Sequence, residues 1–157
     1  MKLNKRTLKS NYMEQEQSMV SYQSTINPEF TVIVIYKEHE RYKEIKDSLE
    51  KMNNSIGVLL VGTKNIFIDG EAVAEQEIDR DQLLAIEAHE IAHSMLNHEA
   101  GIDEHSEKEA DLLGIALLEM SDLQRAASFL KDRMKELYGI DYAAFEEEFD
   151  EINYKSN

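Results

Sequence analysis

The segment that follows Asp79 constrains the fold of this chain more than any other. Six of its apolar residues have a helical spacing: Leu83, Leu84, Ile86, Ile91, Met95 and Leu96. We therefore predict a helix that runs to about Asn97 and buries one stripe of its surface. The rest of the fold is expected to be built around this helix.

Short apolar runs before the helix have the composition of strands. Residues 30–36 are β-branched or aromatic, and two further runs, 56–61 and 65–69, are separated by turn residues around Gly62. We predict one strand from the first run and a hairpin from the other two. A charged helix is expected between them, over roughly residues 37–53.

Three helices are predicted after the central one. Residues 106–109 (Ser-Glu-Lys-Glu) have the form of a capping box, so a helix should start there and run to about Met120. Residues 121–124 repeat the signal for a helix that Gly139 should end, and Asp141 can cap a last helix. The chain is therefore predicted to be α+β, with a small, mainly antiparallel sheet packed on the central helix and further C-terminal helices.

Composition bounds the domain organisation. A chain of 157 residues is the size of one domain and can bury a core without cross-links. Residues 1–27 are rich in Ser, Gln and Asn and show no period, so we expect a flexible leader followed by a single domain over residues 28–153. Because the chain has no cysteine, any metal must be held by His, Asp or Glu.

The charge of the chain and its lack of long apolar runs limit its partners. A formal net charge of −15 argues against binding to nucleic acid, because phosphate contacts depend on clustered Lys and Arg. A basic substrate segment would be attracted, although the simpler interpretation is that acidity keeps the protein soluble. No run approaches the ~20 apolar residues that span a bilayer, and the N-terminus lacks the apolar stretch of a signal peptide. We therefore expect a cytoplasmic protein without a membrane partner.

The candidate chemistry lies inside the predicted central helix, at His89-Glu90-Ile91-Ala92-His93. Side chains at i and i+4 share a helix face, so both imidazoles can bind one ion. Glu90 lies beside the first ligand and can act as the base that takes a proton from an attacking water. The alternative is a surface helix with two solvated histidines.

An acidic cluster opening the next helix offers a third ligand, which a catalytic zinc requires beside one open position. Glu107 and Asp111 share a helix face, whereas Glu109 points elsewhere. We assign Glu107 to the metal, and Asp111 to a hydrogen bond with a ligand histidine, preferably His89. The alternative is an ordinary acidic first turn favoured by the helix dipole, which accounts less well for Asp111.

The combination of the two motifs, over about residues 55–120, resembles the gluzincin metallopeptidases. The compact, soluble ImmA/IrrE-type members are most similar, because the membrane helices of the related HtpX group are absent. Only the thirteen residues 94–106 separate the two motifs, a shorter spacing than in most members. The resemblance implies a minimal zincin-like fold, a Zn²⁺ cofactor, Glu107 as third ligand, Asp111 as the acid that orients the first histidine, and cleavage of a particular protein target.

Two other histidines lie in the connection between the motifs. His98 and His105 can compete as ligands, because imidazole suits zinc. His98 also matches a histidine often present in the HtpX group. The two histidines, with Tyr138 and Tyr142, are the side-chain types that can stabilise an oxyanion, and the sequence does not choose among the four.

The strand predicted at residues 65–69 carries a separate hypothesis. Extended peptides can bind a protease by adding a strand to an exposed sheet edge. If residues 65–69 form the edge beside the cleft, they should hold the substrate backbone. The alternative is an ordinary core hairpin.

The predicted function is zinc-dependent hydrolysis of a peptide bond in a protein or peptide substrate, with His89, His93 and Glu107 on the metal, Glu90 as base and Asp111 orienting His89. A second class of function is a catalytically inactive zinc-binding regulatory or interaction module, which would close the fourth coordination position. A third is a metal-free acidic helical protein that contacts a basic partner. Zinc binding separates the third class from the other two.

Overall fold

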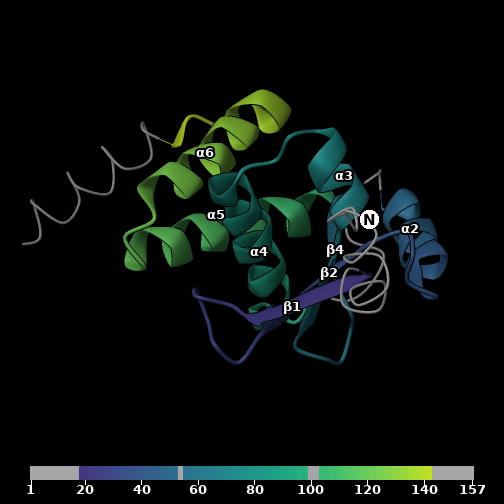
Figure 1. Cartoon of the computed structure of the whole chain (residues 1–157). Coiled ribbons are helices and arrows are strands. Elements are labelled where there is room, and N and C mark those ends of the chain that lie inside the picture. The colour runs from purple at the N-terminus through teal and green to yellow at the C-terminus, as the bar shows by residue number, and fades with distance from the viewer. Residues whose placement is uncertain (1–17, 53–54, 99–102, 143–157) are drawn as a thin grey trace, which may run out of the picture.

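The computed structural model describes residues 18–52, 55–98 and 103–142. Within these ranges the chain forms a four-stranded sheet and five helices (Figure 1). In chain order they are β1 (Met19–Gln23), β2 (Thr31–Ile35), α2 (Tyr42–Lys51), β3 (Gly57–Leu59), β4 (Asn65–Asp69), α3 (Gly70–Glu75), α4 (Arg80–Met95), α5 (Glu104–Met120) and α6 (Gln124–Tyr138). The predicted α+β class is confirmed. None of the helices in these ranges has the length and apolar composition needed to cross a membrane.

The sheet has the strand order β1-β2-β4-β3. β1 pairs antiparallel with β2, β3 pairs antiparallel with β4, and the central β2–β4 pair is parallel. Parallel neighbours need a crossover connection, which α2 and β3 supply between β2 and β4. Two of the three pairings are antiparallel, so the mainly antiparallel sheet and the hairpin of residues 56–69 are confirmed.

β1 lies inside the segment that the sequence predicted to be a flexible leader. It pairs with β2 in a continuous register from Met19↔Ile35 to Gln23↔Thr31. All five of its side chains are exposed, so the strand has none of the apolar alternation that marks a half-buried strand. The leader prediction is therefore wrong over residues 19–23, while residues 1–17 and the predicted domain end at residue 153 lie outside the described residues.

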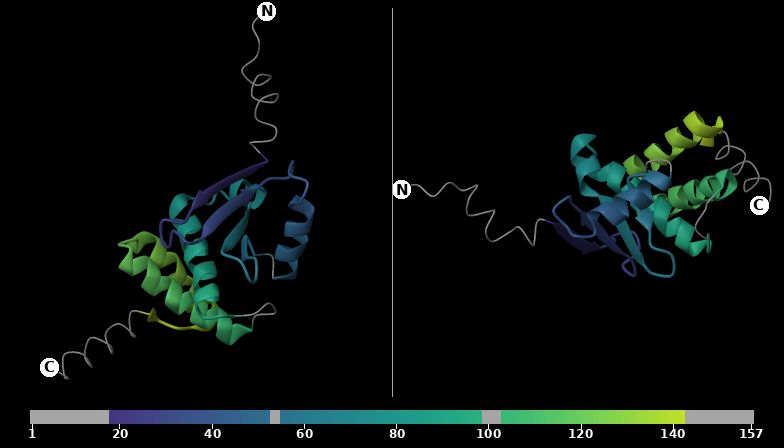
Figure 2. Two further views of the ribbon diagram at one scale, coloured as in Figure 1. Left: turned by 90° about the horizontal axis from the view of Figure 1, so that it is seen from below. Right: turned by 90° about the vertical axis from the view of Figure 1, so that its right-hand side faces the viewer.

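The sheet is covered on both faces. Alternation along β2 and β4 turns one set of side chains toward Ile91 of α4: Val32, Val34, Ile66 and Ile68. It turns Ile35 and Phe67 toward Ile45 and Leu49 of α2. The left view of Figure 2 shows the sheet between α2 on one side and the α4–α6 helices on the other.

α4 occupies the centre of the molecule and is buried on two sides. Opposite the sheet, Ala85 and Ala88 pack in a second core with residues of α5 and α6, including Ile115 and Leu130. The prediction of a single buried stripe is therefore too narrow, and Met95 at the end of that stripe is exposed. A helix covered by layers on two sides has little surface left for polar residues. The charged side chains that α4 nevertheless buries need a structural or functional reason.

The caps define where the helices start. Asp79 caps α4 in a full capping box with Gln82, so the helix starts where the helical period was predicted to begin. α5 starts earlier than predicted, because Asp103 rather than Ser106 is its N-cap, and the Asp103 carboxylate accepts a hydrogen bond from the Ser106 N–H at 2.9 Å. Glu107 and Asp111 consequently lie in the first and second turns of an established helix.

The ends of the last helices correct one prediction and confirm another. Ser121 is the C-cap of α5, and α6 starts at Gln124 without a side-chain cap on Leu123. Residues 121–123 therefore connect the two helices, and residues 121–124 do not form a capping box. Gly139 adopts the left-handed conformation, with φ of 66°, and ends α6 as predicted. The helix predicted from Asp141 extends outside the described residues.

Two predictions about helices before α4 need adjustment. The charged helix expected over residues 37–53 is shorter and spans Tyr42–Lys51. α3 follows β4 directly and was not predicted from the sequence. Asp69 caps it, because its carboxylate accepts hydrogen bonds from the N–H groups of Glu71 and Ala72.

Candidate metal centre

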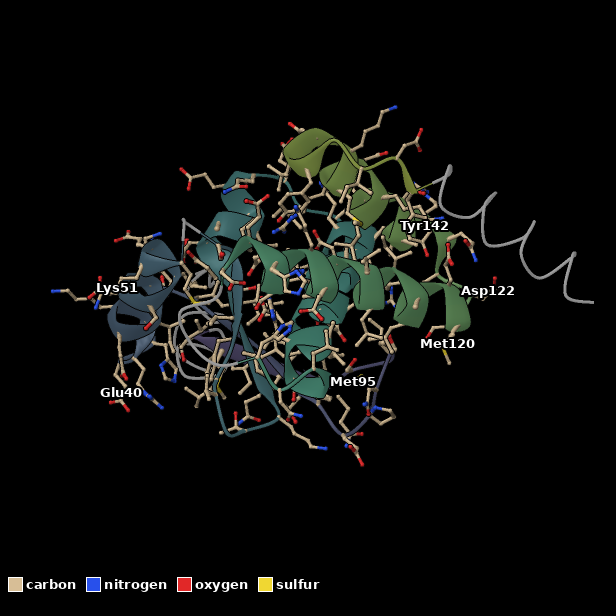
Figure 3. All side chains as sticks on the ribbon, turned by 180° about the vertical axis from the view of Figure 1, so that it is seen from behind. Glu40, Lys51, Met95, Met120, Asp122 and Tyr142 are labelled. Atoms are coloured by element: carbon tan, nitrogen blue, oxygen red, sulfur yellow. The ribbon has the colours of Figure 1, made fainter. Side chains whose placement is uncertain are left out.

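His89 and His93 lie one turn apart on α4 and point the same way. Both are buried, with only 5% and 2% of their surface exposed. Their Nε2 atoms are 2.9 Å apart. Figure 3 shows the molecule from behind, where side chains of α4, α5 and α6 meet in the interior while Met95 and Met120 mark exposed helix ends. The alternative of two solvated histidines on a surface helix is therefore wrong.

Glu107 completes the cluster from the first turn of α5. One of its carboxylate oxygens, Oε2, lies 3.0 Å from Nε2 of His89, and the other, Oε1, lies 3.3 Å from Nε2 of His93. Within the described ranges, these three residues are the one group of at least three His, Cys, Asp or Glu residues whose ligand atoms all lie within 4.8 Å of one another. The structure thus brings together the three residues that the sequence assigned to the metal.

A glycine allows α5 to approach α4 closely enough for these contacts. A Cβ atom on Gly114 would lie 2.9 Å from Cδ1 of Leu130 and 3.4 Å from the backbone N of His89. Gly114 shares its helix face with Asp111 and Glu107, which precede it by three and seven residues. The same close crossing therefore presents both acids to His89.

Asp111 fixes the orientation of the His89 ring. Its Oδ1 lies 2.7 Å from Nδ1 of His89, and its side chain is fully buried. A carboxylate can only accept this hydrogen bond, so Nδ1 carries the proton. The neutral His89 ring then directs the lone pair of Nε2 toward Glu107 and His93, which is the form that binds a metal.

The donor atoms at the centre require a cation. The lone pair of His89 Nε2 and the Glu107 carboxylate face one another at 3.0 Å and would repel without a positive charge between them. Zinc bound at about 2.0–2.1 Å to nitrogen or oxygen holds tetrahedral ligand atoms roughly 3.3 Å apart. The separations of 2.9 to 3.3 Å among the three residues fit that requirement.

Without a metal, a proton supplies this charge. Burial alone would lower the pKa of His89, but hydrogen bonds with Asp111 and Glu107 outweigh it and raise the pKa to about 9. Burial would raise the pKa of Glu107, but hydrogen bonds with His89 and His93 hold it well below its ordinary value. The centre is thus built around a positive charge that faces an ionised Glu107.

Glu90 lies on the face of α4 that meets the edge of the sheet. Its carboxylate is buried, and its Oε2 accepts a hydrogen bond of 2.9 Å from the backbone N–H of Leu59 in β3. Burial raises the pKa of Glu90, and the charges of His89 and His93 and the Leu59 hydrogen bond offset part of that rise. Glu90 is therefore adjacent to the histidine pair and held by a separate element.

Arg133 of α6 joins the site, although no motif in the sequence indicated it. Its Nη2 lies 3.3 Å from Oε2 of Glu107, and its Nε lies 3.6 Å from Oδ2 of Asp111. The guanidinium thus balances two carboxylates that flank His89. Arg133 follows Glu107 by 26 residues, so only the packing of α6 on α5 brings the two together.

His98 and His105 stand apart from the three converging donors. Nδ1 of His98 lies 2.9 Å from Nδ1 of His93, on the far side of that ring from Glu107. Both histidines approach Glu109, at 3.5 Å for His98 and 3.2 Å for His105. Glu109 points away from the candidate ligands, as predicted.

An open cleft of about 760 Å³ gives access to the centre. His89, Glu90, His93 and Glu107 lie on its wall together with further residues of α4, the β3 region, α2 and α6: Lys51, Met52, Ser55, Ile56, Gly57, Ile86, Arg133, Leu137 and Tyr138. Of the four side chains considered as oxyanion donors, Tyr138 lines this cleft. Burial and the charge of Asp111 raise the pKa of Tyr138, so its hydroxyl keeps its proton.

The sheet edge beside the cleft is β3 and not β4. β4 pairs with β2 on one side and β3 on the other, so residues 65–69 form an interior strand. The hypothesis that this strand is a free edge for substrate is therefore wrong. β3 and β4 are the two strands of the hairpin, and their sequences do not indicate which of them lies at the edge of the sheet. Only the strand order reveals β3 as the edge.

No protein-family model matches the chain, and comparisons with curated proteins and with solved structures find no match.

Proposed function

We propose that this chain is a zinc-dependent metallopeptidase, similar to the compact gluzincins, that hydrolyses a peptide bond in a protein target in the cytoplasm. The observation that carries the proposal is the convergence of His89, His93 and Glu107 on one point in the wall of an open cleft, with Glu90 beside them. Two imidazoles and one carboxylate that leave a position open are a typical ligand set for catalytic zinc.

A bound zinc would polarise the substrate carbonyl and lower the pKa of water near neutrality. In the proposed reaction Glu90 takes a proton from the attacking water while the water oxygen forms a bond to the carbonyl carbon. When the C–N bond breaks, Glu90 returns that proton to the leaving amine nitrogen. Its burial suits this exchange, because the raised pKa makes the carboxylate a stronger base.

The other cleft residues have supporting roles in the proposal. Asp111 holds His89 in the tautomer that keeps its Nε2 lone pair available. Tyr138 lines the cleft with a protonated hydroxyl, so it is the side chain that we assign to the developing negative charge on the carbonyl oxygen.

Zinc content tests the proposal first. Untagged wild-type protein should contain about one zinc per chain by elemental analysis, and Glu107→Ala should lose it or bind it more weakly. Glu109→Ala is the matched control, since Glu109 lies in the same helix but faces His98 and His105. If neither wild type nor variant holds zinc after reconstitution, the proposal fails and an acidic interaction module remains.

Cleavage tests the proposal second. Zinc-loaded wild type should cleave peptides from a protein-derived library, and Glu90→Gln should keep its zinc and lose cleavage by about 10²–10⁴-fold. His89→Ala should lose both. Full activity in Glu90→Gln would refute the assigned base, whereas zinc binding without any cleavage would favour the regulatory module.

A further inference from the structure

The Glu90 carboxylate is held by a backbone group of the neighbouring sheet edge. Among the described residues, its hydrogen bond comes from the N–H of Leu59, at 2.9 Å. We propose that the Leu59 N–H is a positioning group for Glu90, which fixes Oε2 and leaves Oε1 to exchange the proton. The assignment of a catalytic purpose rests on the proposed function, whereas the contact itself can be tested independently.

The strand geometry leaves this N–H free for the task. β3 pairs with β4 on one side, where the N–H of Leu60 donates to the carbonyl of Asn65 at 3.0 Å and the carbonyl of Ile56 accepts from Asp69 at 2.9 Å. In an antiparallel pair, successive residues direct their N–H groups to opposite sides. The N–H of Leu59 therefore points away from β4, and using it for Glu90 costs the sheet no hydrogen bond.

A second feature brings the strand within reach of Glu90. A Cβ atom on Gly57 would lie 2.7 Å from Cγ2 of Ile86, closer than side-chain atoms tolerate. Ile86 and Glu90 are separated by four residues and share a face of α4. Because residue 57 has no side chain, β3 can lie against this face, and the Leu59 N–H reaches the carboxylate one turn further along.

The contact is strong enough to set the orientation of the side chain. A hydrogen bond from an N–H to an ionised carboxylate is about twice as strong as one between neutral groups. Glu90 is buried on α4, and among the described residues the Leu59 N–H is the hydrogen-bond donor that restrains its carboxylate. An unrestrained base would turn among rotamers, and a misplacement of about 1 Å can cost about 100-fold in rate.

Hydrogen exchange tests the contact without any metal or substrate. In Glu90→Ala the Leu59 amide should exchange at least about 10-fold faster than in wild type, because its acceptor is gone. The Leu60 amide is an internal control, since its bond to Asn65 is untouched. Unchanged exchange at Leu59 would overturn the proposal, and so would an equal rise at Leu60, because that would mean that β3 opens as a whole.

A proline substitution tests the catalytic purpose. Leu59→Pro deletes the N–H, and an edge strand tolerates proline where the N–H does not serve the sheet. Leu59→Ala removes the same side chain and keeps the N–H. We expect Leu59→Pro to have a kcat about 10–100-fold below that of Leu59→Ala, with similar KM and about one zinc per chain. Equal kcat values in the two variants would overturn the assignment.

A control proline guards against a general effect on folding. Val61→Pro introduces proline two residues later, at the second position of a turn in which Thr63 N–H bonds to Leu60 and Gly62 has φ of 79°, a geometry that accepts proline there. It should match wild type in zinc content and kcat.

In Glu90→Gln, adding Leu59→Pro should cause no further loss of residual cleavage, and a further loss would mean that Leu59 acts independently of Glu90. If Leu59→Pro does not fold, Gly57→Ala, which displaces β3 from Ile86, should raise Leu59 exchange in its place. Zinc-free wild type with a protected Leu59 amide would reject the proposed function and keep the contact.

Discussion

Oδ1 of Asp111 lies 2.7 Å from Nδ1 of His89, in a part of the molecule where the Asp111 side chain has no exposure to solvent. The contact assigns the ring proton to Nδ1 and leaves Nε2 to face Glu107 and His93. Asp111 would thereby act on a cation bound at the candidate metal centre through His89 and not by direct contact.

Replacing Asp111 with Asn should weaken metal binding while preserving the fold. Asparagine has the shape of Asp111 but no charge, so its amide oxygen accepts a weaker hydrogen bond from His89 Nδ1–H. Its NH2 group can instead donate to Nδ1 and hold the ring in the wrong tautomer. We expect a 10–100-fold increase in the Kd for zinc, measured by competition with a chromophoric chelator. Glu109→Gln should leave that Kd within about twofold, because Glu109 faces away from the three ligands. An unchanged Kd in Asp111→Asn would remove Asp111 from the centre.

Truncating Arg133 should destabilise the metal-free protein. In the metal-free protein Arg133 is a second cation beside the buried Asp111, together with the protonated His89, and it also contacts Glu107. Its loss therefore removes part of the counter-charge of two carboxylates. Its side chain is 41% exposed and one contact is long, which reduces the effect to about 1–2 kcal/mol in the free energy of unfolding.

Urea denaturation of Arg133→Ala, Arg133→Lys and wild type measures this effect. Lysine restores the charge but not the forked geometry, so it should recover part of the stability. Arg125→Ala is a suitable control, because Arg125 lies on the same helix and is mostly exposed beside Asp81. Equal stability of Arg133→Ala and Arg125→Ala would contradict the role of Arg133 as a counter-charge.

Glu87 should make the fold less stable as the pH rises. It is buried on α4, and its Oε1 has no partner among the described residues. Burial raises its pKa, and a hydrogen bond with Ser24 and the charge of Arg80 offset part of that rise. The unfolded chain therefore releases the proton at a lower pH than the folded chain. The free energy of unfolding falls as the pH rises from the unfolded value of 4.5 through the raised folded value.

Glu87→Gln removes this dependence. The variant should gain about 1 kcal/mol relative to wild type between pH 4 and pH 8, because no charge has to be buried. Chemical denaturation of both proteins at the two pH values measures the difference. Parallel curves for wild type and variant would show that Glu87 does not titrate differently in the folded state.

Local patterns allowed the convergence of the candidate ligands to be predicted. The i, i+4 spacing of His89 and His93 and of Glu107 and Asp111 each requires only one regular helix, and the turn at Gly62 lies within a short hairpin. Features that depend on packing were not predictable in this way. Arg133 reaches Glu107 only through the crossing of α5 and α6, and the role of the Leu59 N–H leaves no trace in the identity of the side chain.

β1 was not predicted from the sequence, for a different physical reason. Its side chains are exposed on both faces, so hydrophobic alternation, the main sequence signal of a strand, is absent. Pairing of its backbone with β2 holds it in the sheet. For α4 the sequence indicated one buried face, whereas the fold covers two, because a residue such as Ala88 gives no sign of which neighbour it will contact.

Gly114 should control the metal centre through the distance between two helices. A side chain there would press on Leu130 and on the backbone of His89, and Glu107 and Asp111 lie on the same face of α5. In Gly114→Ala the terminal methyl group of Leu130 can move away, and alanine favours the helix by about 1 kcal/mol, so stability should change little. Gly114→Val carries two methyl groups more than Gly114→Ala and should push α5 from α4, raising the Kd for zinc at least about 10-fold with helical content retained. Chelator competition and circular dichroism measure the two effects. If Gly114→Val binds zinc as tightly as Gly114→Ala, the close crossing at this glycine does not position Glu107 and Asp111.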